Sequence, residues 1–286
     1  MEILHEIVPI NGEDMFIILN HPNAKFDYGL HCHPEYEINL VLGTRGTRVV
    51  GDSTEEFGDM DLVIVGPNVP HVWKSDLTEN QRITIQFSSD MLKYEIMGKR
   101  AFAPIRQLLI DTRMGLQFTG EEGEMIKDKI LELTQMQGFS STIAFFSILN
   151  MMATSSRRVL VSNMFDASSV VSASKSRRIA KVCEYIEENL TRDISLSDVA
   201  GLVNMSESAF SHFFRKRTGT TYINYVTNMR IARACNLLAD TTRSASEICY
   251  DCGFNNISNF IRIFTKKKGK TPIEYRKYIT QLITKY

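Results

Sequence analysis

Three side chains that can bind a metal ion or a polar ligand occur close together near the N-terminus. The segment His31-Cys-His33-Pro-Glu-Tyr-Glu37 carries two imidazoles and a carboxylate. Because successive side chains of a β-strand point to opposite faces, His31, His33 and Glu37 share one face if the segment is a strand. His71 can complete a set of four ligands. Imidazole and carboxylate together suit zinc, iron, nickel or manganese.

The same residues also suit a pocket that holds a small organic effector without metal, and this is the interpretation we favour. Pro34 would then bend the strand. Trp73 is the only tryptophan in the chain, and its ring can stack on a sugar or simply belong to the core. The expected effector pocket therefore comprises His31, His33, Glu37, His71 and Trp73. No cofactor is required, and a divalent metal on the three histidines and Glu37 is the alternative.

A second set of residues, in the last ninety positions, has the spacing of a degenerate repeat with an offset of about fifty. Ser195-Leu-Ser-Asp198 and Ser244-Ala-Ser-Glu247 are capping boxes that each precede an apolar helical run. The short helices that follow end in turns at Asn204-Met205 and Gly253-Phe254, where Asn and Gly tolerate a positive φ. The repeat predicts two helix-turn-helix motifs, at about 195–219 and 244–269, that reach successive stretches of DNA major groove.

The second helix of each copy has an apolar stripe and a polar stripe. Phe210 and Phe214 match Phe260 and Phe264 at helical spacing, so these residues are expected in the core. The opposite stripe ends in cations, which are expected to neutralise DNA phosphates. These phosphate-contacting candidates are Arg215, Lys216, Lys266, Lys267 and Lys268. Gly219 and Gly269 are expected to stop the two helices.

From about Ser176 to Tyr278, the chain resembles the AraC/XylS family of bacterial transcription regulators. The similarity rests on Glu247-Ile-Cys-Tyr-Asp-Cys-Gly-Phe254, on Gly269-Lys-Thr-Pro-Ile-Glu-Tyr-Arg276 and on the linking helix at 230–238. Cys249 and Cys252 depart from the small or aliphatic residues that are more usual there. The resemblance implies that six residues read bases, with Arg262 the best candidate for a bidentate contact to guanine. They are Ser208, Ser211 and His212 in the first copy, and Ile257, Ser258 and Arg262 in the second.

Charge is divided unevenly along the chain. The whole chain has 33 basic and 33 acidic residues, but residues from Ala173 onward hold 19 basic and 10 acidic ones. The N-terminal part is correspondingly acidic. This asymmetry indicates a nucleic-acid module joined to a domain of another kind.

Residues 5 to 88 have many short strand-like segments separated by Gly and Asp turns. The segments include 15–19, 35–42, 47–50, 61–65 and 82–87, which together indicate a small antiparallel barrel. The stretch His31–Glu37, with Gly43, Gly58-Asp59 and Pro67-Asn-Val-Pro-His71, resembles the cupin barrel. In that family an H-x-H-x3-E set and a later histidine bind metal, and cupin-like sensors commonly precede AraC/XylS-type DNA-binding modules.

The expected fold is multidomain α+β. It comprises a cupin-like antiparallel β-barrel at 1–90, a helical region at 91–160, a serine-rich linker at 161–175 and an all-α DNA-binding domain at 176–286. Apolar residues at helical spacing predict helices at 121–137 and 140–152. These form either a helical hairpin at a homodimer interface, which we favour, or a cover for the barrel.

The remaining features limit the class of protein. Five cysteines without regular spacing fit a reducing cytoplasm, and Cys249-x-x-Cys252 lacks a second ligand pair nearby. The N-terminus has no signal-peptide pattern, and no run of eighteen apolar residues predicts a membrane span.

These observations predict a cytoplasmic, non-enzymatic transcription regulator that binds double-stranded DNA. Family resemblance adds an activator role, contact with RNA polymerase, and a small-molecule effector, for which a sugar is one candidate. One alternative is a metal-dependent cupin enzyme or metal sensor fused to a DNA-binding module. Another is a regulator that binds no ligand and acts through its own abundance.

Overall fold

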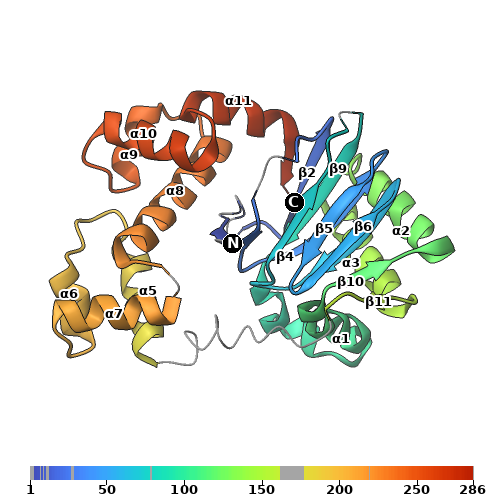
Figure 1. Cartoon of the computed structure of the whole chain (residues 1–286), viewed down its shortest axis with the longest axis horizontal. Helices are drawn as coiled ribbons and strands as arrows, with labels where there is room; N and C mark the ends of the chain where they lie inside the picture. Colours follow the sequence, from blue (N-terminus) through green and yellow to red (C-terminus); the bar gives the residue numbers. More distant parts are fainter. Residues whose placement is uncertain are drawn as a thin grey trace. The chain divides into compact units, whose positions relative to one another are not determined.

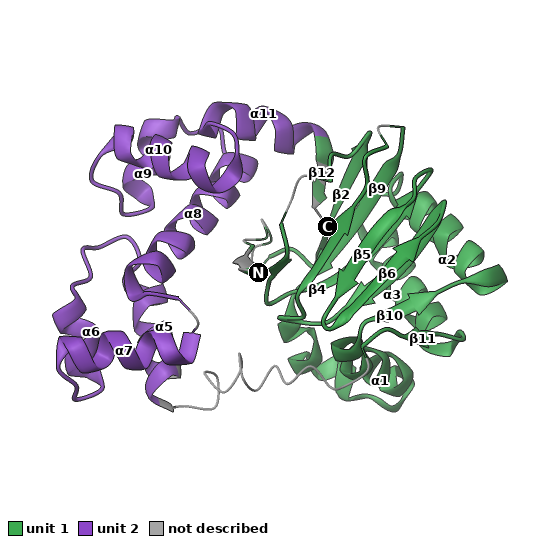
Figure 2. Ribbon diagram, viewed as in Figure 1, with its two compact units in different colours: residues 1–165, 282–286 green, residues 166–281 purple. Residues whose placement is uncertain are grey.

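The computed structural model describes residues 3–6, 8, 10, 13–26, 29–77, 79–161, 177–218 and 220–285. Two compact units are present (Figure 2): Met1–Phe165 with Leu282–Tyr286, and Asp166–Gln281. Of the expected linker at 161–175, only Val161 lies among the described residues, and Gly219 lies outside them. None of the described helices is both long and apolar enough to cross a bilayer.

A seven-stranded antiparallel sheet forms the centre of the first unit (Figure 1). Two of its strands, at 36–42 and 81–87, alternate apolar and polar residues at period two, which gives this part of the sheet two chemically different faces. In spatial order, the strands are β11 (Arg158–Val159), β10 (Leu116–Phe118), β7 (Met60–Val65), β4 (Tyr36–Leu42), β9 (Gln81–Phe87), β2 (Phe16–Pro22) and β12 (Ile283–Lys285).

The apolar face of this sheet is covered by helices. Ile38 and Leu40 of β4 and Ile83 and Ile85 of β9 are fully buried against α1 (Ala103–Asp111), α2 (Gly120–Leu133) and α3 (Phe139–Thr154). The two helices expected at 121–137 and 140–152 correspond to α2 and α3, and their inward faces cover the sheet. Their role in a homodimer stays a prediction.

A smaller sheet lies over the polar face. In order, it contains β1 (Leu4–His5), β3 (His31–Cys32), β8 (His71–Lys74), β5 (Gly46–Val50) and β6 (Ser53–Phe57). Among the described strands neither sheet closes on itself, so the expected cupin-like antiparallel barrel is not confirmed. β3 is only two residues long and pairs with β1 and β8 alone. Pro34, which lacks a backbone N–H, follows it closely.

A buried charge network joins the two sheets. Arg48 of β5 is 1% exposed and donates to Asp61 of β7, which is 0% exposed. The Trp73 indole donates to Asp61 Oδ2 at 2.7 Å, and Gln117 donates to Asp61 Oδ1 at 2.9 Å. Because both charges are paired, their burial is tolerated. The network also fixes the orientation of Trp73.

All of the regular secondary structure described in the second unit is helical. Its helices are α5 (Arg177–Asn189), α6 (Leu196–Leu202), α7 (Glu207–Thr218), α8 (Tyr222–Asp240), α9 (Ala245–Asp251), α10 (Ile257–Lys268) and α11 (Pro272–Leu282). Phe210, Phe214, Phe260 and Phe264 are all 0% exposed, which confirms the predicted core stripes. Cys249 and Cys252 are also buried, and burial raises the pKa of the Cys252 thiol to about 12.

Candidate nucleic-acid interface and ligand pocket

The first helix pair, α6–α7, is built as its local sequence predicts. Ser195 Oγ accepts the Asp198 N–H at 3.1 Å, and the Asp198 carboxylate accepts the Ser195 N–H at 3.1 Å. Asn204 has φ 54°, the left-handed conformation expected at the turn. Ser206 then accepts the Ala209 N–H at 3.3 Å and caps α7.

The second pair, α9–α10, repeats this construction. Ser244 and Glu247 form the capping box, and Asn256 Oδ1 accepts the Asn259 N–H at 2.9 Å at the start of α10. Gly253 has φ 81°, and a Cβ there would lie 2.6 Å from the Leu190 carbonyl oxygen. Glycine is therefore required at this turn for both conformation and space.

The sequence repeat is also a structural repeat. The rings of Phe214 and Tyr225 meet at 5.4 Å and 79°, and those of Phe264 and Tyr275 meet at 5.4 Å and 78°. Arg230 Nε donates to the Leu190 carbonyl at the end of α5. In the same way, Arg276 Nε donates to the Leu238 carbonyl near the end of α8. Each pair is thus held against its neighbouring helices by equivalent contacts.

The outer stripes of α7 and α10 carry the expected base-reading and phosphate-contacting residues. All of the base-reading candidates are exposed except Ile257, which is half-buried: Ser208, Ser211, His212, Ile257, Ser258 and Arg262. The phosphate candidates are also exposed, apart from the half-buried Lys268: Arg215, Lys216, Lys266, Lys267 and Lys268.

Asn259 was not predicted to take part in this surface. It is exposed on α10, and its Oδ1 accepts a hydrogen bond from Arg262 at 2.9 Å. This contact holds the guanidinium over the N-terminal half of the helix. The spacing of three residues between Asn259 and Arg262 on a predicted helix was the available signal.

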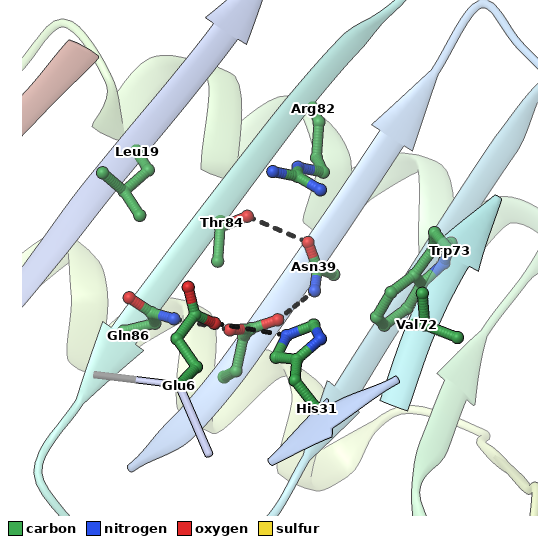
Figure 3. Close-up of a pocket in the computed structure, with 10 residues that line it drawn as sticks. Glu6, Leu19, His31, Asn39, Val72, Trp73, Arg82, Thr84 and Gln86 are labelled. Carbon is green, nitrogen blue, oxygen red and sulfur yellow. Dashed lines mark hydrogen bonds and ion pairs between the residues drawn. The ribbon is translucent and has the colours of Figure 1, made fainter. Parts of the chain in front are cut away.

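The N-terminal unit contains a cavity of about 70 Å³ over the polar face of the seven-stranded sheet (Figure 3). Leu19, Val72 and Trp73 supply its apolar wall. Its polar lining consists of Glu6, His31, Glu37, Asn39, Arg82, Thr84 and Gln86. Three of the five predicted pocket residues, His31, Glu37 and Trp73, thus line this cavity.

Several lining residues were missed from the sequence. Asn39 lies on β4, and Arg82, Thr84 and Gln86 lie on β9, where the register pairs Asn39 with Thr84 and Glu37 with Gln86. Polar residues at every second position of the strand predicted at 82–87 were the signal that could have identified them. Glu6 has no comparable signal, because β1 and β3 pair across a long loop.

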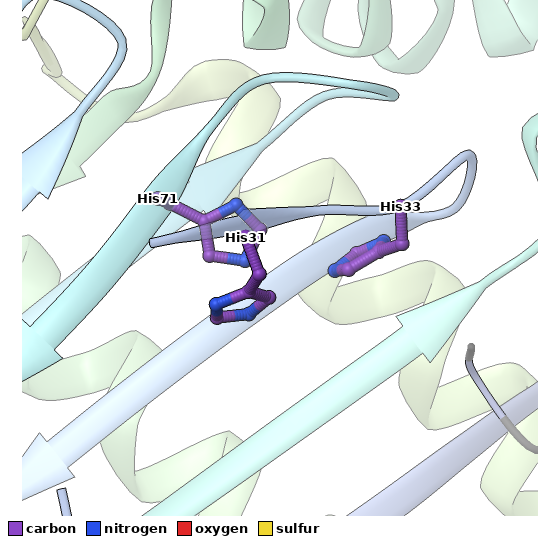
Figure 4. A group of neighbouring side chains, drawn as sticks. All are labelled: His31, His33 and His71. Atoms are coloured by element: carbon purple, nitrogen blue, oxygen red, sulfur yellow. The ribbon is translucent and has the colours of Figure 1, made fainter. Parts of the chain in front are cut away.

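The three histidines lie next to one another (Figure 4), and two of them, His33 and His71, contact Glu37. The rings of His31 and His71 lie 4.4 Å apart, and those of His33 and His71 lie 5.1 Å apart. His33 Nε2 lies 2.9 Å from Glu37 Oε2, and His71 Nε2 lies 3.3 Å from Glu37 Oε1. His33 and His71 are 1% exposed and complete the cluster without lining the cavity.

This convergence does not come from one strand, as the shared parity had suggested. His31 lies on β3, His33 in the following bend, Glu37 on β4 and His71 on β8. The pairing of His31 with His71 across two strands brings the imidazoles together. These side chains therefore lie close together because strands distant in the sequence pair, and not because they alternate along one strand.

The charges of the cluster are set by its own contacts. Burial disfavours a charged Glu37, but His71 and His33 outweigh this effect and hold the pKa of Glu37 well below its usual range. Burial would also lower the pKa of His33, yet the carboxylates of Glu35 and Glu37 beside it raise the pKa to about 10. Burial lowers the pKa of His71 in spite of Glu37. These shifts favour a carboxylate at Glu37 and a proton on His33 rather than on His71.

Comparison with known proteins adds a family context to this geometry. Residues 199–278 match a helix-turn-helix domain family. The chain is 38% identical over 96 residues to the XylDLEGF operon transcriptional activator 2 of Pseudomonas putida, covering 32% of this chain and 60% of that protein. It is 25% identical over 256 residues to the uncharacterized HTH-type transcriptional regulator YfiF of Bacillus subtilis, covering 86% of this chain and 78% of that protein.

Among solved structures, ToxT from Vibrio cholerae O395 has a similar two-unit fold. The TM-score is 0.57 at 12% identity, covering 94% of this chain and 99% of that one. At this identity the similarity concerns the fold alone. Several curated relatives match over about a third of this chain, and the chain spans between 30% and 60% of their length.

Proposed function

We propose that the protein regulates transcription by binding double-stranded DNA under the control of a small effector. The first support is that the chain belongs to the AraC/XylS-type transcriptional regulators. The structural repeat of two capped helix pairs, each with an exposed polar stripe that ends in cations, carries this proposal. Each pair is proposed to act as a helix-turn-helix, with α7 and α10 as the recognition helices.

In this proposal the cations and the base-reading residues have different tasks. Arg215, Lys216 and the lysines at 266–268 neutralise phosphates and supply affinity for any sequence. The side chains near the start of each recognition helix supply sequence preference. Arg262, held by Asn259, is suited to a guanine, because its guanidinium can donate two hydrogen bonds to one base edge.

The cavity of the N-terminal unit is the proposed effector site. An effector that binds one state of the protein more tightly than another shifts the equilibrium between states of different DNA affinity. A structure of ToxT contains a bound unsaturated fatty acid, which supports small-molecule binding by a protein of this fold. We also propose that the protein activates transcription through contact with RNA polymerase. It would act as a homodimer in the cytoplasm.

Binding-site selection with the full chain, followed by titration at several salt concentrations, tests the DNA-binding part. Affinity is expected to fall steeply with salt, since several phosphates release counterions. Lys267→Ala should weaken binding to all selected sequences evenly. Lys129→Ala, which removes an exposed cation from α2, is the matched control and should leave binding unchanged. Binding that does not respond to salt would contradict the proposal.

A second candidate function, a metal site, is favoured by the orientation of the imidazoles. Nitrogen atoms of His31, His33 and His71 lie within 4.8 Å of one another. His31 Nδ1 lies 2.9 Å from the Gly29 carbonyl and His71 Nδ1 lies 2.8 Å from the Val69 carbonyl, an arrangement that orients metal-binding histidines in proteins. His71 Nε2 is buried without a hydrogen-bond partner in the described structure.

The donor set therefore fits a divalent transition metal held by His31, His33, His71 and Glu37. Such an ion would supply Lewis acidity, which a metal sensor or a metal-dependent enzyme fused to a DNA-binding module could use. Elemental analysis of the purified protein tests this candidate, together with assays for turnover of small molecules. Metal at one per chain that is lost in His71→Ala would support it, whereas metal-free protein that still responds to an organic effector would contradict it.

A further inference from the structure

The cavity contains one cation that the surrounding acids do not neutralise. Glu6 Oε2 lies 3.2 Å from His31 Nε2, and Glu37 lies 2.9 Å from His33. Arg82 forms no ion pair in the described part of the chain, and its Nε atom is buried without a hydrogen-bond partner. Arg82 as a whole is half-buried, and its guanidinium has no charged hydrogen-bond acceptor among the described residues.

The neighbours of Arg82 hold the side chain without compensating its charge. Its guanidinium carbon lies 5.8 Å from the centre of the Phe26 ring. Across the β2–β9 pair it faces His21, and burial and the Arg82 charge lower the pKa of His21 to about 4, although Glu6 opposes this shift. His21 is therefore neutral at pH 7. Arg82 shares its face of β9 with Thr84 and Gln86 and points into the cavity (Figure 3).

We propose that Arg82 is the anion-binding residue of this cavity and that the ligand is a short monocarboxylate carrying a hydroxyl group. The inference rests on the proposed effector site and names the chemical class of its ligand. A guanidinium presents its N–H groups in a planar fork that matches a carboxylate. A neutral polyol or sugar would leave Arg82 uncompensated.

The remaining polar atoms limit the rest of the ligand. Gln86 Nε2 donates to Glu37 at 2.6 Å, whereas Gln86 Oε1 is buried and has no partner among the described groups. Thr84 donates its hydroxyl proton to Asn39 Oδ1 at 2.9 Å, so its oxygen is left as an acceptor. Acceptors without donors complement a ligand hydroxyl. Leu19 and Val72 limit the rest of the ligand to a small apolar part.

The volume and the charges of the cavity favour a small monoanion. A volume of about 70 Å³ corresponds to roughly five positions of water size, at the ~10–15 Å³ that one water requires. Glycolate, with roughly five non-hydrogen atoms, matches this size. Glu6 and Glu37 line the same cavity and would repel a dianion such as phosphate, whereas one uncompensated cation balances one negative charge.

Isothermal titration of the full chain, treated with a chelator and dialysed, tests the proposal with glycolate and its neutral analogue glycolamide. Glycolate is expected to bind, and glycolamide to bind at least 10-fold more weakly, because it lacks the charge. Arg82→Gln should weaken glycolate binding by about 10- to 100-fold, the range for the loss of a charge-assisted hydrogen bond. Arg82→Lys should retain part of the affinity. Arg100→Gln, an exposed arginine outside the cavity, is the matched control.

The possible outcomes test the proposed ligand class separately from the proposed DNA-binding function. Equal binding of glycolate and glycolamide, unchanged glycolate binding in a folded Arg82→Gln variant, or tighter binding of inorganic phosphate would overturn the proposal. Absence of glycolate, lactate and glycerate binding by the wild-type chain would also overturn it. Circular dichroism checks the fold of each variant. Failure of DNA binding in the separate salt titration would reject the regulator function while leaving glycolate binding intact.

Discussion

The turns of the two helix pairs occupy equivalent positions but have different requirements. Asn204 and Gly253 both have positive φ, 54° and 81°. A side chain fits at the first turn, whereas a Cβ at Gly253 would meet the Leu190 carbonyl at 2.6 Å and Arg230 Nε at 3.0 Å. The turn at Gly253 packs against the end of α5 and against Arg230, which binds the Leu190 carbonyl there. The turn at Asn204 has the same left-handed conformation but carries an asparagine side chain.

This difference separates two reasons for glycine in a repeat. At Asn204 the backbone alone requires the left-handed conformation, which asparagine tolerates. At Gly253 the close approach of another segment adds a requirement for space. The outer stripes differ as well, since α7 presents Ser208, Ser211 and His212 where α10 presents Ile257, Ser258 and Arg262. Under the proposed function, a shared core with different surfaces predicts two half-sites of different base sequence.

The largest expected effect comes from Gly253→Ala, which tests the close approach. We expect a loss of about 3 kcal/mol of unfolding free energy, from left-handed strain of ~1–2 kcal/mol together with displacement of the Arg230–Leu190 hydrogen bond. Urea denaturation followed by far-ultraviolet circular dichroism measures the loss in the helices. Trp73 fluorescence reports on the N-terminal unit and should not change.

Gly269→Ala is the control for this effect. Gly269 has φ 66°, but no atom lies within 4 Å of its Cβ position among the described residues. The expected cost is therefore left-handed strain alone, about 1 kcal/mol. Equal costs at Gly253 and Gly269 would show that crowding at the second turn contributes nothing.

The next largest effect concerns the different surfaces of the recognition helices. Arg262→Ala should relax specificity in one half-site only, with a cost of about 1–3 kcal/mol for the preferred base. His212→Ala should act more weakly on the other half-site, about one DNA turn away or roughly 10 bp. Binding-site selection with each variant measures both effects. If Arg262→Ala weakens all sequences equally, Arg262 contacts phosphate, and Ile257 and Ser258 become the leading base readers of α10.

Capping boxes are the feature that the two pairs share most closely. Ser195→Ala and Ser244→Ala should each cost about 1 kcal/mol of unfolding free energy, because each removes an acceptor for the N–H of the third helical residue. Ser258→Ala, exposed within α10, is the control and should change stability by less than about 0.5 kcal/mol. Thermal or urea denaturation measures all three. A loss of unfolding free energy in only one of these two variants would mean that the two capping boxes do not contribute equally to stability.

The features of the helix pairs could be predicted because they depend on residues a few positions apart. Capping boxes, left-handed turns at Asn204 and Gly253 and the apolar stripes all act within one or two helical turns. The extent of the cavity lining could not be predicted equally well. His31 and His71 meet through the pairing of β3 with β8, and Arg82 reaches the cavity because β9 lies between β2 and β4.

The arrangement of the strands into a barrel could not be predicted for the same reason. The strands at 35–42, 61–65 and 82–87 were predicted from short strand-like segments separated by turn residues, which is a local signal. Whether a sheet closes depends on which edges pair, and that is decided between segments far apart in the chain. Alternation on β9 nevertheless contained usable information, since Arg82, Thr84 and Gln86 were visible as a polar stripe.

The smallest expected effect is a substitution at the first turn. Asn204→Gly should change the unfolding free energy by only a few tenths of a kcal/mol, because glycine relieves the left-handed strain but gains more entropy in the unfolded chain. The reciprocal change Gly253→Asn should cost several times more, since it adds a side chain where the Leu190 carbonyl lies 2.6 Å from the Cβ position. Urea midpoints of the two variants, measured by circular dichroism, compare the turns directly. If both substitutions are equally mild, the space at the second turn is adjustable and conformation alone accounts for its glycine.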